Sequence, residues 1–262
     1  MSNSVHSGHP PELAFEGAVA TLTLRRPAVA NRLDLDDLHT LRQRVFQAEQ
    51  RPEVRVLKLQ AEGRHFCSGF HIGQVHADAG GVAKGAEGFE AVADALEQSR
   101  LVSVAVIQGG VYGGGADVAL ACDFRMGCPA STLMVPAARL GVVYYRGGLQ
   151  RFVTRLGLQT AKRILLSAQT LDAQALERCG YLDRLLPSAE AMHAEVDALI
   201  QRLAHMAPLA LQGMKHHLNL IARGTLDAAA LAQDMARAAA SQDVIEGARA
   251  WEEKREPRFT GH

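Results

Sequence analysis

The sequence predicts an α/β fold in which a β/α core is followed by an all-helical C-terminal region. Strand-like and helix-like segments alternate in the first half of the chain, the pattern becomes helical after Gly147, and residues 225–255 are rich in alanine. Such alternation predicts parallel strands that are covered by helices. We therefore expect a short disordered lead over residues 1–11, a β/α core over 12–200 and a helical region over 201–262.

Short runs of β-branched and apolar residues predict the strands of the core. They are expected at residues 18–24, 54–60, 101–107, 123–127 and 131–135. Between the first two, apolar residues recur at helical spacing from Asp34 to Gln50, which predicts a helix. A Gly-rich polar stretch over 73–88 predicts a surface loop that leads into a helix at about 89–99.

Capping residues predict where two helices of the second half begin and end. Asp172 is a typical N-cap residue and Gly180 a typical C′ glycine, so they are expected to bound one short helix. Pro208 suits the first turn of a helix, which is expected to run to about Ile221. The Ala-rich residues 225–255 are expected to continue as helix.

Composition and charge limit the classes of function. Hydrophobic residues make up 48% of the 262 residues and charged residues 21%, which is typical of a globular protein. Lys plus Arg equals Asp plus Glu at 28 each, so the zero net charge argues against a nucleic-acid or membrane-surface partner. No run of about 18 apolar residues is present, so no segment is expected to cross a membrane.

The N-terminus and the cysteines predict the compartment. The first residues, MSNSVHSGHPPE, lack the basic start and the apolar run of a signal peptide. None of the four cysteines has the spacing of metal ligands. We therefore expect reduced thiols in a cytoplasmic protein, with no metal site.

A cluster of glycines from Gly109 to Gly115 follows the strand at 101–107 and begins a helix. Glycines let the backbone approach a ligand closely, and the free N–H groups of a helix start lie at the positive end of its dipole. The cluster lacks the G-K-[ST] of a P-loop and the spacing of a dinucleotide fingerprint. It predicts an anion site, and a close-packed turn without a ligand is the alternative interpretation.

A second loop, residues 64–73, follows the strand at 54–60 and contains Gly69. One glycine is weak evidence for a ligand site, and a plain turn is the alternative. In folds of this class, however, ligands bind at the loops that leave the strand ends. The loops at 63–73 and 108–117 are therefore the two places where a ligand site is expected.

Five stretches of the chain resemble, in order and spacing, those of the crotonase (enoyl-CoA hydratase/isomerase) superfamily. F-C-S-G-F-H-I at 66–72 is similar to the family's F-C-A-G-x-D-I. G-G-G-A-D-V-A-L-A-C-D-F-R at 113–125 is similar to G-G-G-x-E-L-A-x-x-C-D-x-R. The other three lie at residues 24–31, 139–158 and 251–259. The resemblance covers about residues 12–262, and five ordered motifs make it specific.

The resemblance implies a crotonase-type ββα spiral core, a helical C-terminal region, and assembly as a homotrimer or a dimer of trimers. It also implies an acyl-CoA thioester as substrate, with no metal and no cofactor apart from the coenzyme A of the substrate. Two backbone N–H groups, which the motifs map to Phe70 and Gly114, would form an oxyanion hole for the thioester oxygen. In other enzymes, removing one such donor raises the barrier by about 2.7–4 kcal/mol.

The same resemblance maps further residues to the substrate and coenzyme A. They are Arg26, Ser68, His71, Ile72, Tyr145 and Lys254. Arg26 and Lys254 are hypothetical partners of the coenzyme A phosphates, and ordinary solvated surface residues are the alternative. For His71 the alternative is a hydrogen-bonded loop histidine.

The chain departs from the family pattern at both catalytic carboxylates. Typical hydratases use two glutamates, one to activate water and one to move the α-proton. The first position falls on Asp117, and the second falls on Ala137, which cannot move a proton. Asp117 is therefore the predicted acid/base residue. The alternative is a first-turn carboxylate that the helix dipole stabilises.

Tyr144 and Tyr145 replace the family's proline–glycine pair. A tyrosine at position 144 resembles the methylmalonyl-CoA decarboxylase branch, so Tyr144 is a candidate catalytic residue that orients a substrate carboxylate, as is Arg146. That branch has histidine where this chain has Phe70, which argues against the assignment. Packing against the acyl chain or the adjacent helix is the alternative for both tyrosines.

These residues favour a reaction that needs at most one carboxylate. Double-bond isomerisation needs one base and decarboxylation needs none, so both are favoured over two-carboxylate hydration. A non-catalytic acyl-CoA-binding trimer is the alternative from another class, because the second glutamate is missing. An RNA-binding relative is disfavoured by the zero net charge.

Overall fold

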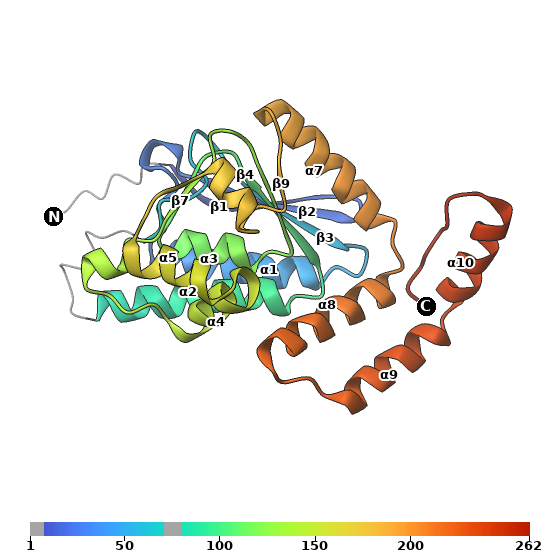
Figure 1. The fold of residues 1–262 in the computed structure, drawn as a ribbon. Coiled ribbons are helices and arrows are strands. Elements are labelled where there is room, and N and C mark those ends of the chain that lie inside the picture. Colours follow the sequence, from blue (N-terminus) through green and yellow to red (C-terminus); the bar gives the residue numbers. More distant parts are fainter. Residues whose placement is uncertain (1–7, 71–79) are drawn as a thin grey trace.

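The computed structural model describes residues 8–70 and 80–262 and confirms the predicted α/β class. The larger of two sheets has the strand order β1-β2-β3-β4-β6-β9, in which β1 and β2 are antiparallel and the following pairs are parallel (Figure 1). Its strands are β1 (His9–Glu16), β2 (Val19–Arg25), β3 (Val56–Ala61), β4 (Val102–Ile107), β6 (Phe124–Gly127) and β9 (Arg184–Leu185). The smaller sheet contains β5 (Gly110–Tyr112), β7 (Thr132–Met134) and β8 (Leu171–Asp172).

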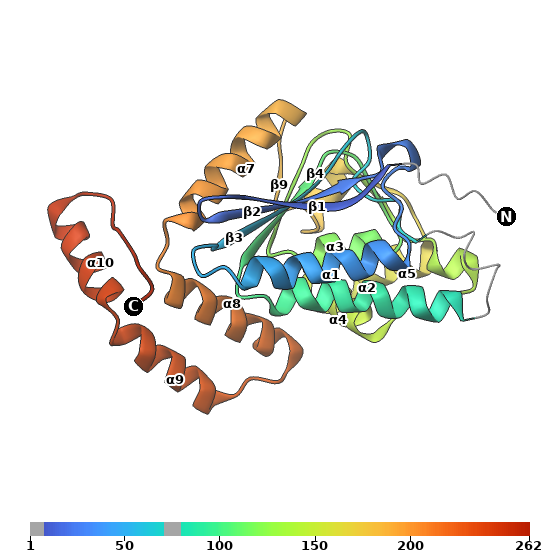
Figure 2. The ribbon, with the colours of Figure 1, turned by 180° about the vertical axis from the view of Figure 1, so that it is seen from behind.

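Helices cover both faces of the larger sheet (Figures 1 and 2). One face carries α1 (Leu35–Glu49), α2 (Gly81–Gln98), α3 (Gly114–Ala121), α4 (Arg146–Leu156) and α5 (Leu158–Ser167). The other face carries α7 (Ala189–Ala204). Shorter elements are α6 (Ala173–Arg178) and two 3₁₀ turns, η1 (Pro27–Val29) and η3 (Ala137–Leu140).

Strand β4 shows why the sheet is covered on both faces. Ala105 and Ile107 belong to the apolar cluster that the sheet shares with α1–α5. Val102, Val104 and Val106 belong to the cluster that it shares with α7. Side chains of a strand alternate between the two faces, so a strand that is buried on both is a continuous apolar run. This pattern is the one from which the strand was predicted.

The first strand begins at His9, within the lead that was predicted to be disordered up to residue 11. Pro10 and Pro11 are compatible with it because β1 is an edge strand, where an absent N–H leaves no ladder bond unmade. The pairing of β1 with β2 is irregular between His9 and Glu12. The prediction of disorder is therefore wrong for residues 9–11.

The predicted surface loop over 73–88 is wrong for residues 81–88, which form the first half of α2, and residues 73–79 lie outside the described part. The glycines there serve close packing rather than a turn. A Cβ on Gly85 would lie 2.9 Å from Phe70 Cε1, and one on Gly88 would lie 2.8 Å from Leu38 Cδ1. The glycine content of this stretch suggested a loop. The sequence does not show that Gly85 and Gly88 pack against the side chains of Phe70 and Leu38.

The second half of the chain is less uniformly helical than expected. Asp172 caps α6, and Gly180 beyond its end has a φ of 75°, both as predicted. The two-residue strands β8 and β9 were not predicted, because strands this short carry no periodic pattern.

The last three helices form a C-terminal arm and are α8 (Pro208–Arg223), α9 (Ala228–Ala239) and α10 (Gln242–Glu253). In this arm α8 lies against the core, and α9 and α10 extend away from it (Figures 1 and 2). Helix α7 spans the expected boundary at residue 200 and packs on the sheet. The continuous helix expected over 225–255 is divided, because Ser241 adopts an extended conformation as the N-cap of α10. No helix within residues 8–70 and 80–262 has the length and apolar character needed to cross a membrane.

Candidate active site

The two glycine loops lie against each other, as the sequence predicts. Tyr112 N donates a hydrogen bond to Cys67 O at 2.8 Å, which joins the segment after β3 to β5. Gly69 has a φ of 83°, and a Cβ placed on it would lie 2.9 Å from Tyr112 O and 3.5 Å from Gly114 N. The two backbones therefore touch at position 69, where only glycine fits both the space and the positive φ.

Phe70 and Gly114 each present a backbone N–H that has no hydrogen-bond partner within the described residues. Gly114 is the first residue of α3, so its N–H lies outside the helical ladder. In the other loop, Leu33 N donates to Gly69 O at 2.9 Å, and the N–H of the next residue, Phe70, donates to none of the described residues. Two adjacent free donors are what an oxyanion hole requires, and that role stays a prediction.

Both residues line a cavity of about 280 Å³ whose lining is mainly apolar. The described lining contains no carboxylate and no cationic side chain. Ala137, at the position of the second family glutamate, is part of it. The lining residues are Ser68, Phe70, Val82, Gly85, Ala86, Phe89, Gly113, Gly114, Val135, Pro136, Ala137, Leu140, Val142, Val143, Tyr144 and Tyr145.

The carboxylate of Asp117 lies behind this cavity. Asp117 is in the first turn of α3 and is fully buried. Arg151 of α4 holds it with two hydrogen bonds, from Nε to Oδ1 at 2.9 Å and from Nη2 to Oδ2 at 2.7 Å. The hydroxyl of Tyr145 donates to Oδ2 at 2.9 Å. Among the described lining residues, Tyr145 is therefore the contact between the cavity and Asp117, which does not reach the cavity itself.

The two tyrosines are packed together at the start of α4. Their rings are stacked with centroids 4.6 Å apart, and a side chain at Gly148 would collide with both. The hydroxyl of Tyr144 donates to Gly113 O at 3.1 Å. Burial, followed by the nearby negative charge of Asp117, raises the pKa of Tyr144 well above its ordinary value. Burial also raises the pKa of Tyr145, so both phenols stay neutral.

A network of buried and half-buried charges continues behind Asp117. Arg151 also pairs with Asp94 at 2.6 Å and with Glu97 at 3.1 Å. Arg223, at the end of α8, pairs with both of these acids, so the network reaches the C-terminal arm. Burial alone would lower the pKa of Arg151, but its hydrogen bonds and charge interactions with Asp117, Asp94 and Glu97 raise it. Arg151 is therefore fully charged.

The predicted coenzyme A residues of the 64–72 loop are only partly described. Ser68 lines the cavity, and its hydroxyl donates to Val29 O at 3.3 Å. His71 and Ile72 lie outside the described residues. Their predicted contacts with coenzyme A stay predictions.

The two predicted phosphate partners lie outside the described cavity lining. Arg26 pairs with Asp37 at 2.9 Å and with Asp34 at 3.6 Å, at the start of α1. Lys254 is exposed at the end of α10, in the arm (Figure 1). The structure thus does not bring Arg26 and Lys254 together with the cavity.

Phe89 and Arg151 were missed from the sequence. Phe89 was expected on the apolar side of a helix, but its ring also lies against Gly114, where an added Cβ would be 2.5 Å from Phe89 Cγ. Arg151 shares the buried face of α4 with Gly147, Gly148 and Phe152. An arginine on the apolar face of an amphipathic helix was the available sign of a buried ion pair.

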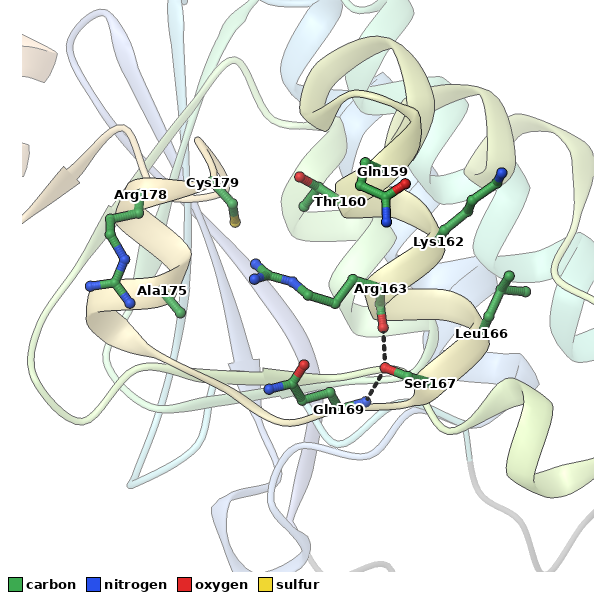
Figure 3. A pocket seen from close by; sticks show the side chains of 10 residues that line it. All are labelled: Gln159, Thr160, Lys162, Arg163, Leu166, Ser167, Gln169, Ala175, Arg178 and Cys179. Atoms are coloured by element: carbon green, nitrogen blue, oxygen red, sulfur yellow. Dashed lines mark hydrogen bonds between the residues drawn. The ribbon is translucent and has the colours of Figure 1, made fainter.

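A second cavity of about 610 Å³ lies between α5 and α6 (Figure 3). It is more polar, and Arg163 extends across it from α5 toward α6. It contains none of the predicted site residues. The smaller cavity, at the two glycine loops, is therefore the candidate active site.

Comparisons with known proteins identify the family of the chain. A family model described as enoyl-CoA hydratase/isomerase matches residues 14–262. The carnitinyl-CoA dehydratase of Proteus mirabilis is 28% identical over 269 residues, which cover 100% of both chains. An enoyl-CoA isomerase/hydratase of Mycosarcoma maydis is 29% identical over 267 residues, with 96% of each chain covered.

The solved structure of an enoyl-CoA hydratase/carnitine racemase from Magnetospirillum magneticum has a TM-score of 0.91 to this chain, at 27% identity and with 98% of each chain covered. The architecture is therefore the crotonase fold that the sequence predicted. Together, the motif order, the fold and the matched model show that the chain belongs to the enoyl-CoA hydratase/isomerase family.

Proposed function

We propose that the protein isomerises a double bond in an acyl-CoA thioester through an enolate. The observation that carries this proposal is the pair of N–H groups of Phe70 and Gly114, which have no partner among the described residues, at a mainly apolar cavity. When a proton leaves the α-carbon, negative charge develops on the thioester oxygen. Two fixed donors stabilise that charge strongly where water is largely excluded. Family membership supports the acyl-CoA substrate.

Hydration is the less favoured reaction because it needs a second carboxylate to activate water. Ala137 occupies that position and lines the cavity. No carboxylate is present among the other described lining residues. Some relatives are named as a dehydratase or a hydratase. The experiment below therefore also tests hydration.

Decarboxylation is less favoured because a substrate carboxylate would lack a partner. The described lining contains no Arg, Lys or His, and Arg146 is exposed outside it. The hydroxyl proton of Tyr144 is donated to Gly113 O, and that of Tyr145 to Asp117. Tyr144 is therefore better explained by packing than by orienting a carboxylate. Isomerisation needs neither a second carboxylate nor a cation.

We also propose a homotrimer or a dimer of trimers, with the C-terminal arm in the contact between subunits. Met214, Leu218 and Ile221 form one exposed stripe on α8, at 59%, 65% and 55% exposure. An apolar stripe of this kind usually marks an interface.

A cytoplasmic location is proposed as well, supported by four cysteines that are unpaired in the structure.

The assembly is tested by sedimentation of the wild type and of Leu218→Lys. A trimeric or hexameric wild type and a smaller variant would support the proposal. A monomeric wild type would contradict it. Leu158→Lys, the same substitution at an exposed leucine on α5, is the control for the added charge.

The reaction is tested by incubating the protein in D₂O with saturated, 2-enoyl, 3-enoyl and 2-carboxyacyl-CoA thioesters, followed by NMR and mass spectrometry. Isomerisation predicts conversion of the 3-enoyl thioester, with deuterium at the α- or γ-carbon. Loss of CO₂ from a 2-carboxyacyl thioester would show that the protein is a decarboxylase instead of an isomerase. Addition of water alone would show that it is a hydratase. Binding of every thioester without turnover or exchange would indicate the non-catalytic acyl-CoA-binding trimer instead.

A further inference from the structure

Tyr145 occupies the boundary between the cavity and the buried charge of Asp117. Tyr145 lines the cavity, and its hydroxyl donates to Asp117 Oδ2 at 2.9 Å. Arg151 covers the other approaches to the carboxylate, with one hydrogen bond to each oxygen. A substrate in the cavity would therefore meet Tyr145 before it met the carboxylate of Asp117.

We propose that Tyr145 is the catalytic residue that exchanges protons with the substrate, and that Asp117 is the base behind it. This inference rests on the proposed enolate function and names the group that performs its proton transfer. The α-carbon gives its proton to Tyr145 Oη while the original hydroxyl proton passes to Asp117 Oδ2. The electron pair of the broken C–H bond enters the enolate, which Phe70 N–H and Gly114 N–H hold.

The second half of the reaction is the reverse transfer at another carbon. Asp117 returns the proton to Tyr145 Oη, and the hydroxyl proton that Tyr145 then carries is delivered to the γ-carbon. The double bond moves from between the β- and γ-carbons to between the α- and β-carbons. No proton, electron pair or co-reactant is left over, and Tyr145 and Asp117 end as they began.

Tyr145 acts as a neutral relay and never as a phenolate. Burial and the adjacent negative charge of Asp117 raise its pKa well above the ordinary value, so loss of its proton without replacement is unfavourable. A concerted transfer avoids that state because one proton arrives as the other leaves. Arg151 keeps Asp117 in the orientation that accepts the hydrogen bond from the Tyr145 hydroxyl. Arg151 is therefore a positioning residue.

Tyr144 is the less suitable relay, although it lines the same cavity. Its hydroxyl donates to the carbonyl oxygen of Gly113, which cannot take up a proton at neutral pH. Among the described lining residues, only Tyr145 has a hydroxyl that is hydrogen-bonded to a carboxylate. The stacking of the two rings and their contact with Gly148 hold the Tyr145 ring in place.

The test compares Tyr145→Phe and Asp117→Asn with the wild type by the rate of deuterium incorporation from D₂O into a 3-enoyl-CoA. Affinity for a saturated acyl-CoA is measured in parallel. The relay predicts that both variants bind as the wild type does but lose at least about 100-fold in exchange and turnover, in the range for a lost acid/base group. Tyr181→Phe is the control, because Tyr181 is buried outside the cavity and its hydroxyl donates to Ala116 O.

The outcomes distinguish failure of the relay from failure of the enolate function. Wild-type exchange in Tyr145→Phe would overturn the relay and leave the enolate function standing. Loss in Asp117→Asn with full exchange in Tyr145→Phe would assign the chemistry to Asp117 directly and also overturn the relay. Absence of exchange and turnover in the wild type for every thioester would overturn the enolate function, and the relay with it.

Discussion

The α-carbon of Gly69 lies so close to Tyr112 that a Cβ at position 69 would stand 2.9 Å from the Tyr112 carbonyl oxygen. The contact brings the loop that carries Phe70 against the loop that carries Gly114. Any side chain at position 69 must push the two loops apart and change the spacing of their two N–H donors.

The first prediction concerns Gly69→Ala. Its kcat should fall on the order of 100-fold, as when one oxyanion donor is lost. Gly180→Ala is the matched control, because Gly180 also has a positive φ, of 75°, but has open space around it. Both variants should lose about 1–2 kcal/mol of stability from the left-handed backbone. Equal activity in the two variants would argue against the importance of the loop contact.

The second prediction concerns the Asp117–Arg151 pair. Arg151→Met leaves a buried carboxylate without its cation, which should cost about 3–5 kcal/mol of unfolding free energy. Urea unfolding measures this. Arg249→Met, which removes an exposed pair with Glu253 on α10, is the control and should change the urea midpoint little. If the two variants unfold at the same urea concentration, the prediction that Arg151 stabilises the folded protein by pairing with Asp117 is wrong.

The third prediction restores the second carboxylate of the family pattern. Ala137→Glu places a carboxylate at the cavity and should raise the rate of 2-enoyl-CoA hydration by about 100-fold, the lower end of the range for general acid–base catalysis. Ala138→Glu adds the same charge at an exposed neighbour outside the cavity and should have no such effect. A stable Ala137→Glu that binds acyl-CoA without added hydration would show that the position does not face the reacting carbon.

The fourth prediction concerns acid stability. Burial alone would raise the pKa of Glu97, but the hydrogen bond from Arg223 and the charges of Arg151, Arg155 and Arg223 lower it below the usual 4.5. A carboxyl whose pKa is lower in the folded state contributes stability above its unfolded pKa, and that contribution is lost as pH falls through the folded pKa.

Wild-type stability should therefore drop as the pH falls below about 4.5, and Glu97→Gln should show a shallower pH dependence there. Chemical unfolding between pH 3 and 7 measures both curves. Parallel curves would show that Glu97 titrates alike in the folded and unfolded protein.

The sequence predicted those parts of the fold that depend on local pattern. Strand β4 and the caps of α6 follow from periodicity and capping residues. The start of α2 did not, because only the packed neighbours Phe70 and Leu38 show why its glycines are tolerated in a helix. The division of the arm into α9 and α10 was missed because alanine is compatible with either arrangement.

The motifs of the sequence predicted the backbone groups of the candidate site. Phe70 and Gly114 line one cavity, as the two loops suggested. The partner of Asp117 was not predictable, because Arg151 is 34 positions away and becomes its partner only when α3 and α4 pack. The sequence identified a carboxylate for the chemistry without showing that a phenol separates it from the cavity.

The first half of helix α2 should open to solvent more readily than strand β4. Gly85 and Gly88 each weaken an isolated helix by about 1 kcal/mol relative to alanine. The first half of α2 is therefore held mainly by the side chains of Phe70 and Leu38, which approach its backbone where a Cβ would not fit. Its amides should exchange with solvent sooner than those of β4, and an acyl chain that fills the cavity beside Phe89 should slow that exchange.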